Sequence, residues 1–459
     1  MQRTLVIPSG MWKRLRTRLF PEDGAEGFVA GLARPCRTFT GIRYVLEQYL
    51  DMAEESFDYR HEAGLALTRD ESSRLNIISV KAAGFGLVPV HLHSHPDGSP
   101  DFSAYDDMQE ADLHGWLDQQ GQPLLLSLVC ARDAMPRARL WHGHSHERCR
   151  VRIGLQTIFS PEESVSTLPA LDRQRAFGKH FTDAAAGLSV GIVGLGGVGM
   201  PVAEQLARSG FRHFVFMDPD KVEVVNLNRL SGLRCRDVGR FKTDVATAAV
   251  KRGCNSVGIA ASVRTCRADI NTASARQRAL LGRCDLILAL TDDELSRIRC
   301  LTLALEHGAE YLQAGVRIGQ DAGAIDSIKT EVTGAETGRY CPICSGRLDP
   351  GQASIEARRY VGGEVYAAAR AGGYIPEEPA PSVMSLNAIA AGALVLEIQK
   401  RVAGLEAADL MQQDWLTGDF LHIQDIEKCL AEDECAICGR NRLPPGIWSR
   451  QAAGPAGQA

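Results

Sequence analysis

The sequence predicts an α/β protein of two domains, the second of which is built on a doubly wound parallel sheet. Its 459 residues exceed the roughly 150 residues that one domain typically contains. The composition, with 45% hydrophobic and 23% charged residues, is that of a packed globular protein. From residue 188 onward, short apolar segments alternate with amphipathic helical segments, which is the pattern of a parallel sheet with covering helices.

Changes in composition along the chain predict where the domains begin and end. Residues 1–150 combine a helical opening with short strands and form a small α/β domain. Pro, Ser and Glu gather around residues 160–178, so 151–185 is expected to be a linker with entry helices. The alternating strands and helices of 186–445 form the second domain, and the small residues of 446–459 form a flexible tail.

The overall charge and hydropathy argue against some classes of partner. Lys and Arg number 51 and Asp and Glu number 56, so the formal net charge is −5 and no nucleic-acid partner is expected. The opening residues lack the apolar core of a signal peptide, and no stretch approaches the roughly 18 apolar residues of a membrane span. We therefore expect a cytoplasmic protein without a membrane partner.

The first group of candidate metal ligands lies in HLHSHPDGSPDFSAYDD, residues 91–107. On a strand, His91, His93 and His95 share one face because side chains alternate with period two. Two imidazoles can then converge on one metal, and Asp106 as a third ligand leaves one tetrahedral position open for water. Zinc in such a site lowers the pKa of its bound water towards about 7 and so supplies hydroxide at neutral pH.

The spacing of these residues resembles the JAMM motif of MPN-type zinc metalloproteases, a deubiquitinase-like family. As in that motif, HSHP is followed after six residues by a serine, and after two more by an aspartate. The resemblance implies an N-terminal JAMM domain in which His93, His95 and Asp106 bind a catalytic zinc ion. It also implies that Ser103 helps to stabilise the tetrahedral intermediate.

The same family uses a glutamate on an early strand to transfer the proton. Glu26, in DGAEGFVAGLA, fits this role best, with Glu22 as the alternative. His91 shares the strand face but lies outside the motif. A second set of alternating histidines, in WHGHSHER, is expected to be a solvated strand end, and comprises His142, His144 and His146.

A glycine-rich segment, GIVGLGGVG, joins an apolar strand to an amphipathic helix at residues 191–199. Its glycines allow the amides at the start of the helix to face a phosphate, and they are Gly194, Gly196, Gly197 and Gly199. The next strand ends at Asp218, whose carboxylate can accept hydrogen bonds from a ribose. A nicotinamide dehydrogenase would share these features.

The polar residues that follow favour phosphoryl chemistry over hydride transfer. They are Asp220, Asn226, Arg229, Lys242 and Asp292. Cations around a nucleotide suit phosphoryl chemistry because Arg, Lys and magnesium stabilise the charge on the transferred and leaving oxygens. Asp292, in LALTDDELSR, is the expected magnesium ligand.

Residues 170–440 resemble the ThiF-type adenylyltransferases, the superfamily of ubiquitin-activating and sulfur-carrier-activating enzymes. The resemblance implies a Rossmann-like adenylation domain in which the glycine loop and Asp218 hold ATP. The Asn, Arg and Lys of the polar series would contact its phosphates, and Asp292 would organise Mg²⁺. The reaction would be attack of a C-terminal carboxylate on the α-phosphate, which yields an acyl adenylate and pyrophosphate. Such proteins often contribute an arginine across a homodimer interface, and Arg173, or the nearby Arg175, would occupy that position.

The cysteines predict a second metal site and raise a question about acyl transfer. Two CxxC pairs offer four thiolates and hence a closed structural zinc site, with redox chemistry as the alternative: Cys341, Cys344, Cys435 and Cys438. Ubiquitin-activating enzymes carry a transfer cysteine after the nucleotide core, but residues 345–400 contain no cysteine. Cys235 is the nearest thiol in the sequence, although an ordinary loop or buried cysteine would also fit it.

Together these features predict a bifunctional enzyme of a bacterial ubiquitin-like modification pathway, such as an antiphage or stress system. The peptidase would process a small ubiquitin-like protein, and the second domain would adenylate its C-terminal glycine, with or without a separate conjugating enzyme. One alternative is the processing and activation of a sulfur carrier for thiocarboxylate formation. Another is a binding scaffold in which one site has decayed.

Overall fold

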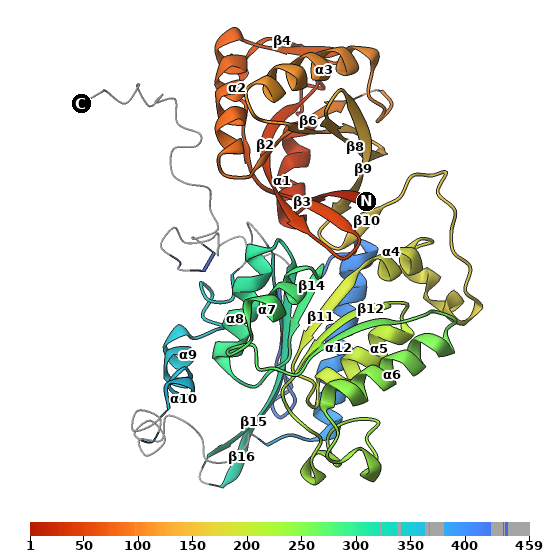
Figure 1. Ribbon diagram of the computed structural model, residues 1–459, viewed down its shortest axis with the longest axis vertical. Coiled ribbons are helices and arrows are strands. Elements are labelled where there is room, and N and C mark those ends of the chain that lie inside the picture. The colour runs from red at the N-terminus through yellow and green to blue at the C-terminus, as the bar shows by residue number, and fades with distance from the viewer. Residues whose placement is uncertain are drawn as a thin grey trace. The chain divides into compact units, whose positions relative to one another are not determined.

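In the computed structural model, the chain folds into two compact units (Figure 1). Unit 1 contains residues 1–153 and 157–162, and unit 2 contains 154–156 and the described residues from 163 to 438. The described residues are 1–96, 98–321, 323–336, 341–362, 367, 381–423, 435, 437 and 438.

Unit 1 is built on a sheet that closes on itself. Its strand order is β1-β3-β2-β6-β7-β8-β9-β10, and β1 also pairs in parallel with β9 to complete a ring of strands. The strands are β1 (Gln2–Ile7), β2 (Phe28–Arg37), β3 (Gly41–Leu50), β6 (Val88–His95), β7 (Leu124–Ala131), β8 (Ala134–His142), β9 (Ser145–Ile153) and β10 (Gln156–Ile158). A separate hairpin consists of β4 (Phe57–His61) and β5 (Gly64–Leu67).

Three helices cover the two faces of this sheet. They are α1 (Ser9–Leu19), α2 (Arg69–Ala83) and α3 (Ala104–Gln119), and a 3₁₀ turn, η1 (Glu54–Ser56), precedes β4. The apolar side of α1 packs with Val90 and Leu92 of β6 in the main core. On the other side of the sheet, residues of the strands β2, β7 and β8 pack with α2 and α3 in smaller clusters. The odd-numbered residues of β6 therefore face away from α1, and these include all three histidines of the strand.

Unit 2 contains the doubly wound sheet that the alternating sequence pattern predicts. Its strand order is β13-β12-β11-β14-β15-β16-β17-β18, with parallel pairing from β13 to β15 and antiparallel pairing beyond. The strands are β11 (Ser189–Val193), β12 (His213–Met217), β13 (Ser262–Cys266), β14 (Leu286–Ala289), β15 (Glu310–Asp321), β16 (Ala324–Ala335), β17 (Leu410–Asp414) and β18 (Phe420–Ile423). The sequence pattern does not indicate the three antiparallel strands.

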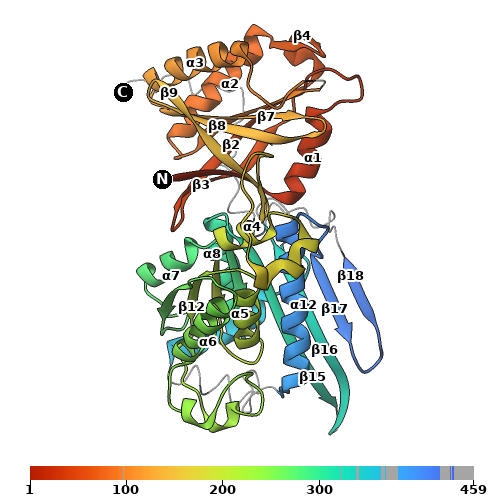
Figure 2. The ribbon, with the colours of Figure 1, turned by 90° about the vertical axis from the view of Figure 1, so that its right-hand side faces the viewer.

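Helices pack on both faces of this sheet, with α5, α6 and α12 grouped together on one of them (Figures 1 and 2). The helices are α4 (Phe181–Gly187), α5 (Gly199–Arg208), α6 (Lys242–Ser256), α7 (Ala275–Gly282), α8 (Glu294–Glu306), α9 (Pro350–Glu356), α10 (Arg358–Val361) and α12 (Met384–Ala403). The 3₁₀ segments are η2 (Pro169–Phe177), η3 (Val224–Asn226) and η4 (Cys235–Asp237). Within the described residues, no helix is both long and apolar enough to cross a membrane.

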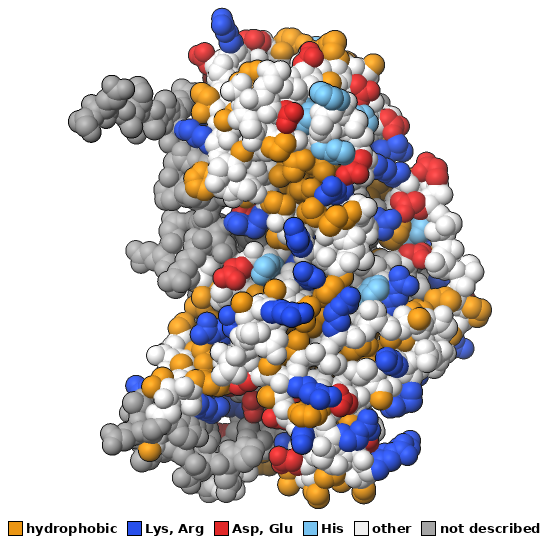
Figure 3. All heavy atoms as spheres, in the orientation of Figure 1, with side chains coloured by type: hydrophobic (Ala, Val, Ile, Leu, Met, Phe, Trp, Pro, Cys, Tyr) orange, Lys and Arg blue, Asp and Glu red, His pale blue; other side chains and the backbone are white. Residues whose placement is uncertain are grey.

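The surface carries charges of both signs. On the face drawn in Figure 3, Lys and Arg side chains are dispersed among hydrophobic, acidic and uncharged ones. This mixture agrees with the small formal net charge of −5.

Candidate metal and nucleotide sites

Three predicted zinc ligands meet at the end of β6 and the start of α3 in unit 1. One ligand atom from each of His93, His95 and Asp106 lies within 4.8 Å of the others. His93 Nε2 is 3.3 Å from Asp106 Oδ1, and His95 Nε2 is 3.5 Å from Asp106 Oδ2. The structure thus brings together the three residues that the spacing of the motif predicts.

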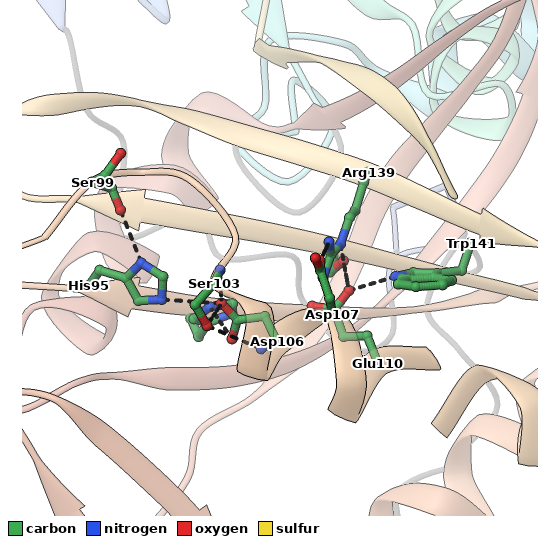
Figure 4. A network of polar contacts seen from close by, with 10 residues as sticks. His95, Ser99, Ser103, Asp106, Asp107, Glu110, Arg139 and Trp141 are labelled. Atoms are coloured by element: carbon green, nitrogen blue, oxygen red, sulfur yellow. Dashed lines mark hydrogen bonds and ion pairs between the residues drawn. The ribbon is translucent and has the colours of Figure 1, made fainter. Parts of the chain in front are cut away.

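Ser103 fixes the direction of the Asp106 carboxylate through a capping box at the start of α3 (Figure 4). The Ser103 hydroxyl accepts a hydrogen bond from the Asp106 N–H at 3.1 Å and donates one to Asp106 Oδ2 at 2.7 Å. The Ser103 N–H donates to the same oxygen at 2.6 Å. This reciprocal capping stabilises the first turn of the helix and places the serine hydroxyl beside the metal ligands.

The protonation and burial of this cluster fit a zinc ion. Burial opposes ionisation of Asp106, but its contacts with His93 and His95 outweigh burial and hold the carboxyl pKa well below its usual range. His93 Nε2 is buried and lies 3.3 Å from Asp106 Oδ1, but it forms no hydrogen bond with any described residue. A buried imidazole nitrogen that makes no hydrogen bond is costly unless a further ligand satisfies it. Two imidazoles and one carboxylate are the donor set of a zinc site with an open fourth position.

Glu26 lies directly before β2, near this cluster. It is half-buried, and burial raises the pKa of its carboxyl, whereas the charges of His95 and His93 lower it. Glu22 is exposed. Of the two candidates, Glu26 is therefore the one whose carboxyl is within reach of the charges of His93, His95 and Asp106.

The other histidines of unit 1 do not join the cluster. His91 packs edge-on against Phe28 with ring centroids 5.2 Å apart, and burial lowers its pKa to about 4, so it is neutral at pH 7. No potential metal-binding group among the described residues includes the histidines of the β8–β9 turn. These are His142, His144 and His146, of which the last two are exposed, as expected for a solvated strand end.

A buried polar network, which sequence reasoning missed, holds α3 against β7 and β8 (Figure 4). Glu110 Oε2 accepts hydrogen bonds from Ser127 Oγ at 2.6 Å, Arg139 Nε at 2.8 Å and Trp141 Nε1 at 2.7 Å. Arg139 also pairs with Asp107. The available signal was an arginine inside the apolar strand segment RARLW, since a buried charge requires a partner.

Glu110→Ala is expected to lower the free energy of unfolding of unit 1 by about 3–5 kcal/mol, because Arg139 would lose its buried carboxylate and keep only the exposed Asp107 as an ionic partner. The side chains of Glu110 and Arg139 are only 8% and 4% exposed. Denaturant unfolding followed by tryptophan fluorescence measures the change. Asp51→Ala, which removes the exposed pair with Arg18, is the control and should cost less than about 1 kcal/mol. Equal effects of the two substitutions would contradict the prediction.

In unit 2, the glycine loop lies at the point where the strand order reverses. β11 pairs with β12 on one side and with β14 on the other, and ligands of such sheets bind beyond the carboxyl ends of these strands. Gly194 has φ of 90°, and a Cβ there would lie 2.6 Å from the carbonyl oxygen of Leu290. A Cβ on Gly199 would overlap the Gly194 carbonyl, whereas one on Gly196 would meet nothing within 4 Å. Glycine is therefore required at position 199, where α5 begins against the loop after β11, and at position 194, where this loop touches the loop after β14.

Asp218 is hydrogen-bonded to the backbone of the glycine loop. Its Oδ2 accepts a hydrogen bond from the Leu195 N–H at 2.7 Å, and its Oδ1 accepts one from the Asp220 N–H at 2.8 Å. Burial raises the pKa of this carboxyl, while Lys242 and the two amides lower it. Contact of Asp218 with a ribose remains a prediction and would use the remaining lone pairs of the carboxylate.

The polar residues that were predicted to surround the nucleotide phosphates differ in their hydrogen-bond and ion-pair partners. Lys242, at the start of α6, pairs with the exposed Asp220 through an Nζ to Oδ2 distance of 2.8 Å. Asn226 is buried, and its Oδ1 accepts a hydrogen bond from the Glu223 N–H at 3.0 Å, so it shapes the turn at η3. Arg229 is half-buried nearby in sequence. Any contact of these residues with phosphates remains a prediction.

The two aspartates after β14 have different roles. Asp293 caps α8, because its Oδ1 accepts a hydrogen bond from the Ser296 N–H at 2.8 Å. Asp292 is exposed and makes no hydrogen bond or ion pair with the described residues. Of the two carboxylates, Asp292 is therefore the one available to a cation.

Two arginines of η2 were candidates for a contact across a dimer interface. Arg175 pairs with Asp172 at 2.9 Å. Arg173 is exposed and forms no ion pair with the residues that the structure describes. Arg173 is thus the one free to act on a ligand or a second chain, although the dimer itself remains a prediction.

Asn387, in the first turn of α12, is a residue near the glycine loop that sequence reasoning missed. It is 2% exposed, and its Nδ2 donates to the Ser382 hydroxyl at 3.0 Å and to the Arg229 carbonyl at 3.4 Å. A Cβ on Gly197 would overlap this amide. The available signal was a polar residue on the apolar face of a long helix.

The four cysteines of the CxxC pairs also come together in unit 2. Their sulfur atoms lie within 4.8 Å of one another, with Cys344 Sγ and Cys438 Sγ 3.5 Å apart. The contact between Cys341 and Cys438 lowers the pKa of the first thiol and raises that of the second, so Cys341 is the one that readily becomes the thiolate that a metal needs. This donor set fits a closed structural zinc site. Cys235 lies apart from it, exposed in η4.

Cys344→Ser is expected to remove one zinc per chain and to lower the melting temperature of unit 2, because three thiolates cannot close a tetrahedral site. Metal analysis of the dialysed protein and calorimetry measure the two effects. Cys235→Ser is the control and should keep both zinc content and melting temperature. An unchanged zinc content in Cys344→Ser would exclude this site.

A glycine loop at the reversal point of a doubly wound sheet defines a nucleotide-binding α/β protein. The sequence model of the ThiF family matches residues 171–436, more than half of the chain. The chain therefore belongs to the ThiF family, which confirms the predicted resemblance.

Relatives of this chain align with it over only part of their own length. The NEDD8-activating enzyme E1 catalytic subunit of Caenorhabditis elegans is 28% identical over 143 residues, which cover 28% of this chain and 33% of that protein. Ubiquitin-like modifier-activating enzyme 5 of Oryza sativa subsp. japonica is 31% identical over 139 residues, which cover 28% of this chain and 32% of that protein. The chain thus spans about a third of the length of these relatives. Among solved structures, E. coli MccB with MccA-N7isoASN aligns with 90% of this chain and 99% of its own, with a TM-score of 0.47 and 13% identity.

Proposed function

We propose that unit 2 catalyses ATP-dependent adenylation of the C-terminal glycine carboxylate of a small ubiquitin-like protein. The observation that carries this proposal is the glycine loop that touches the loop after β14, in a chain of the ThiF family. Lys242 and the available Asp292 lie in segments that follow β12 and β14. Both relatives described above are activating enzymes by name, which agrees with the same activity here.

In this reaction, some residues of unit 2 bind the nucleotide and others stabilise the charge on its phosphates. The backbone amides of the glycine loop bind phosphate oxygens, and Arg229 and Lys242 neutralise the charge on them. Asp292 holds the Mg²⁺ that accompanies the nucleotide. The carboxylate oxygen of the carrier forms a bond to the α-phosphorus, and the bond from that phosphorus to the pyrophosphate oxygen breaks. The products are the acyl adenylate and pyrophosphate, and Arg173 of a second copy would add positive charge in a homodimer.

Unit 1 is, in the same proposal, a JAMM-type zinc peptidase that exposes this glycine or removes the carrier from its targets. The observation that carries it is the convergence of His93, His95 and Asp106. Bound zinc would supply an activated water at neutral pH. The Glu26 carboxylate, with a raised pKa, would accept a proton as the water oxygen bonds to the scissile carbonyl carbon, and it would return the proton to the amine nitrogen as the C–N bond breaks. The Ser103 hydroxyl, whose one proton is donated to Asp106 Oδ2 in the structure, would turn that proton towards the developing oxyanion.

The absence of cysteine from residues 345–400 favours a second candidate for the step after adenylation. Without a transfer cysteine there, a sulfur nucleophile, as in sulfur-carrier activation, or a group of a separate conjugating enzyme can bond to the carbonyl carbon of the adenylate, with release of AMP. Mass spectrometry of the carrier distinguishes a thiocarboxylate from an ester or amide product.

Exchange of labelled pyrophosphate into ATP tests the adenylation directly. Each small glycine-ended protein encoded near this chain is mixed with the full protein, zinc, Mg²⁺ and ATP. The proposal expects exchange that requires the carrier and is lost when its terminal glycine is deleted. Release of ADP would contradict the proposal because it shows cleavage at the γ-phosphate. No exchange with any carrier would also contradict it and would favour a binding scaffold.

A further inference from the structure

Ser94 separates the two histidines of the proposed zinc site, and its side chain points the other way, into the core. It is fully buried. Its hydroxyl donates to the carbonyl of Leu19, the last residue of α1, and accepts a hydrogen bond from the Gly27 N–H at 2.9 Å. Its backbone N–H also donates to the Gly27 carbonyl at 3.0 Å. One side chain thus connects α1, β6 and the segment before β2.

The segment before β2 carries Glu26. Its N–H donates to the carbonyl of His61 at the end of β4, at 3.0 Å, so the segment is held from a second side. A Cβ on Gly27 would overlap the backbone of Arg18 and Leu19, which shows how tightly this segment packs against α1. The carboxyl of Glu26 is close enough to the metal ligands for their charges to act on it.

We propose that Ser94 is a positioning residue for the peptidase: its hydroxyl fixes the Gly27 backbone and so holds Glu26 beside the three metal ligands. The inference rests on the proposed peptidase function of unit 1. The hydroxyl contacts none of the metal ligands, so its loss displaces the proton-transfer group and leaves the zinc donor set intact. The expected signature is a lower kcat at unchanged zinc content.

The test compares Ser94→Ala with Ser127→Ala in the full, zinc-loaded chain. Ser127 is a matched control, because it is also fully buried on a strand of unit 1, and its hydroxyl donates to Glu110 rather than to the Glu26 segment. Peptidase kinetics, zinc content and hydrogen exchange of the Gly27 amide are measured for each.

We expect Ser94→Ala to lower kcat about 10- to 100-fold, the effect of misplacing one catalytic group, with KM and zinc content retained. The Gly27 amide should exchange faster in Ser94→Ala and at the wild-type rate in Ser127→Ala. Gly27→Ala shifts the same backbone by overlap and should give the same kinetic signature. Ser94→Cys keeps a donor and acceptor at this position but makes a weaker hydrogen bond, so it should show an intermediate loss and serves if Ser94→Ala does not fold.

Two results would overturn the inference while leaving the peptidase in place. One is an active wild type with an equally active Ser94→Ala, and the other is loss of zinc together with activity in Ser94→Ala. A zinc-loaded wild type that cleaves no carrier precursor or conjugate would overturn both the peptidase and the inference, and the wild-type assay alone reveals that case.

Discussion

Replacing His95 with alanine is expected to abolish cleavage by unit 1 and to leave adenylation by unit 2 within about twofold of wild type. The substitution removes one of three protein ligands, so the remaining imidazole and carboxylate cannot retain the ion in its tetrahedral site. Metal-ion catalysis supplies several kcal/mol, which corresponds to a loss of about a thousandfold or more in cleavage rate. Cleavage of a carrier fusion, metal analysis and pyrophosphate exchange are measured on the same preparation.

His146→Ala is the matched control, since His146 is an exposed histidine outside the cluster. It should keep full cleavage and full zinc content. A His95→Ala protein that retains its zinc and still cleaves would exclude the proposed site. Loss of pyrophosphate exchange in a folded His95→Ala protein would contradict the independence of the two activities.

Asp292→Asn is expected to lower carrier-dependent pyrophosphate exchange about 100- to 1000-fold, the cost of removing one group that stabilises transition-state charge. The variant keeps the shape of the side chain and removes the charge that would hold Mg²⁺. Cleavage by unit 1 should remain at the wild-type rate, which makes this result the converse of that for His95→Ala.

The neighbouring carboxylate provides the control for this variant. Asp293→Asn keeps a side-chain oxygen for the cap of α8, because asparagine caps helices as well as aspartate does. Exchange by Asp293→Asn should remain near that of wild type. An Asp293→Asn protein that loses as much exchange as Asp292→Asn would show that the assignment between the two residues is wrong.

Local sequence patterns predicted those residues of both sites that lie within one short segment of the chain. The period of a strand predicts that His93 and His95 share a face. The resemblance to the JAMM motif adds Asp106, which the structure places in the first turn of α3. The glycine segment likewise predicts a loop between β11 and α5, because positive φ and close approach are properties of a few adjacent residues. The structure brings these residues together as the patterns predict.

Contacts between distant segments could not be predicted in this way. The bonds of Glu110 join residues 17 to 31 positions apart, and Asn387 contacts a carbonyl 158 positions away. The three antiparallel strands beyond β15 depend on pairings that no local period specifies. The two CxxC pairs were the exception, because metal ligands are recognised by residue type whatever the distance between them.

In the proposed function, one chain prepares and activates the same carboxylate at two separate sites. The most direct test of this proposal is the intact mass of a carrier precursor, extended beyond its C-terminal glycine, after incubation with the zinc-loaded protein, Mg²⁺ and ATP. We expect loss of the extension followed by gain of the mass of an adenylyl group, with the first step absent in His95→Ala and the second strongly reduced in Asp292→Asn. A precursor that stays uncut while its mature form is adenylated, or a cut carrier that never gains an adenylyl group, would contradict the proposal.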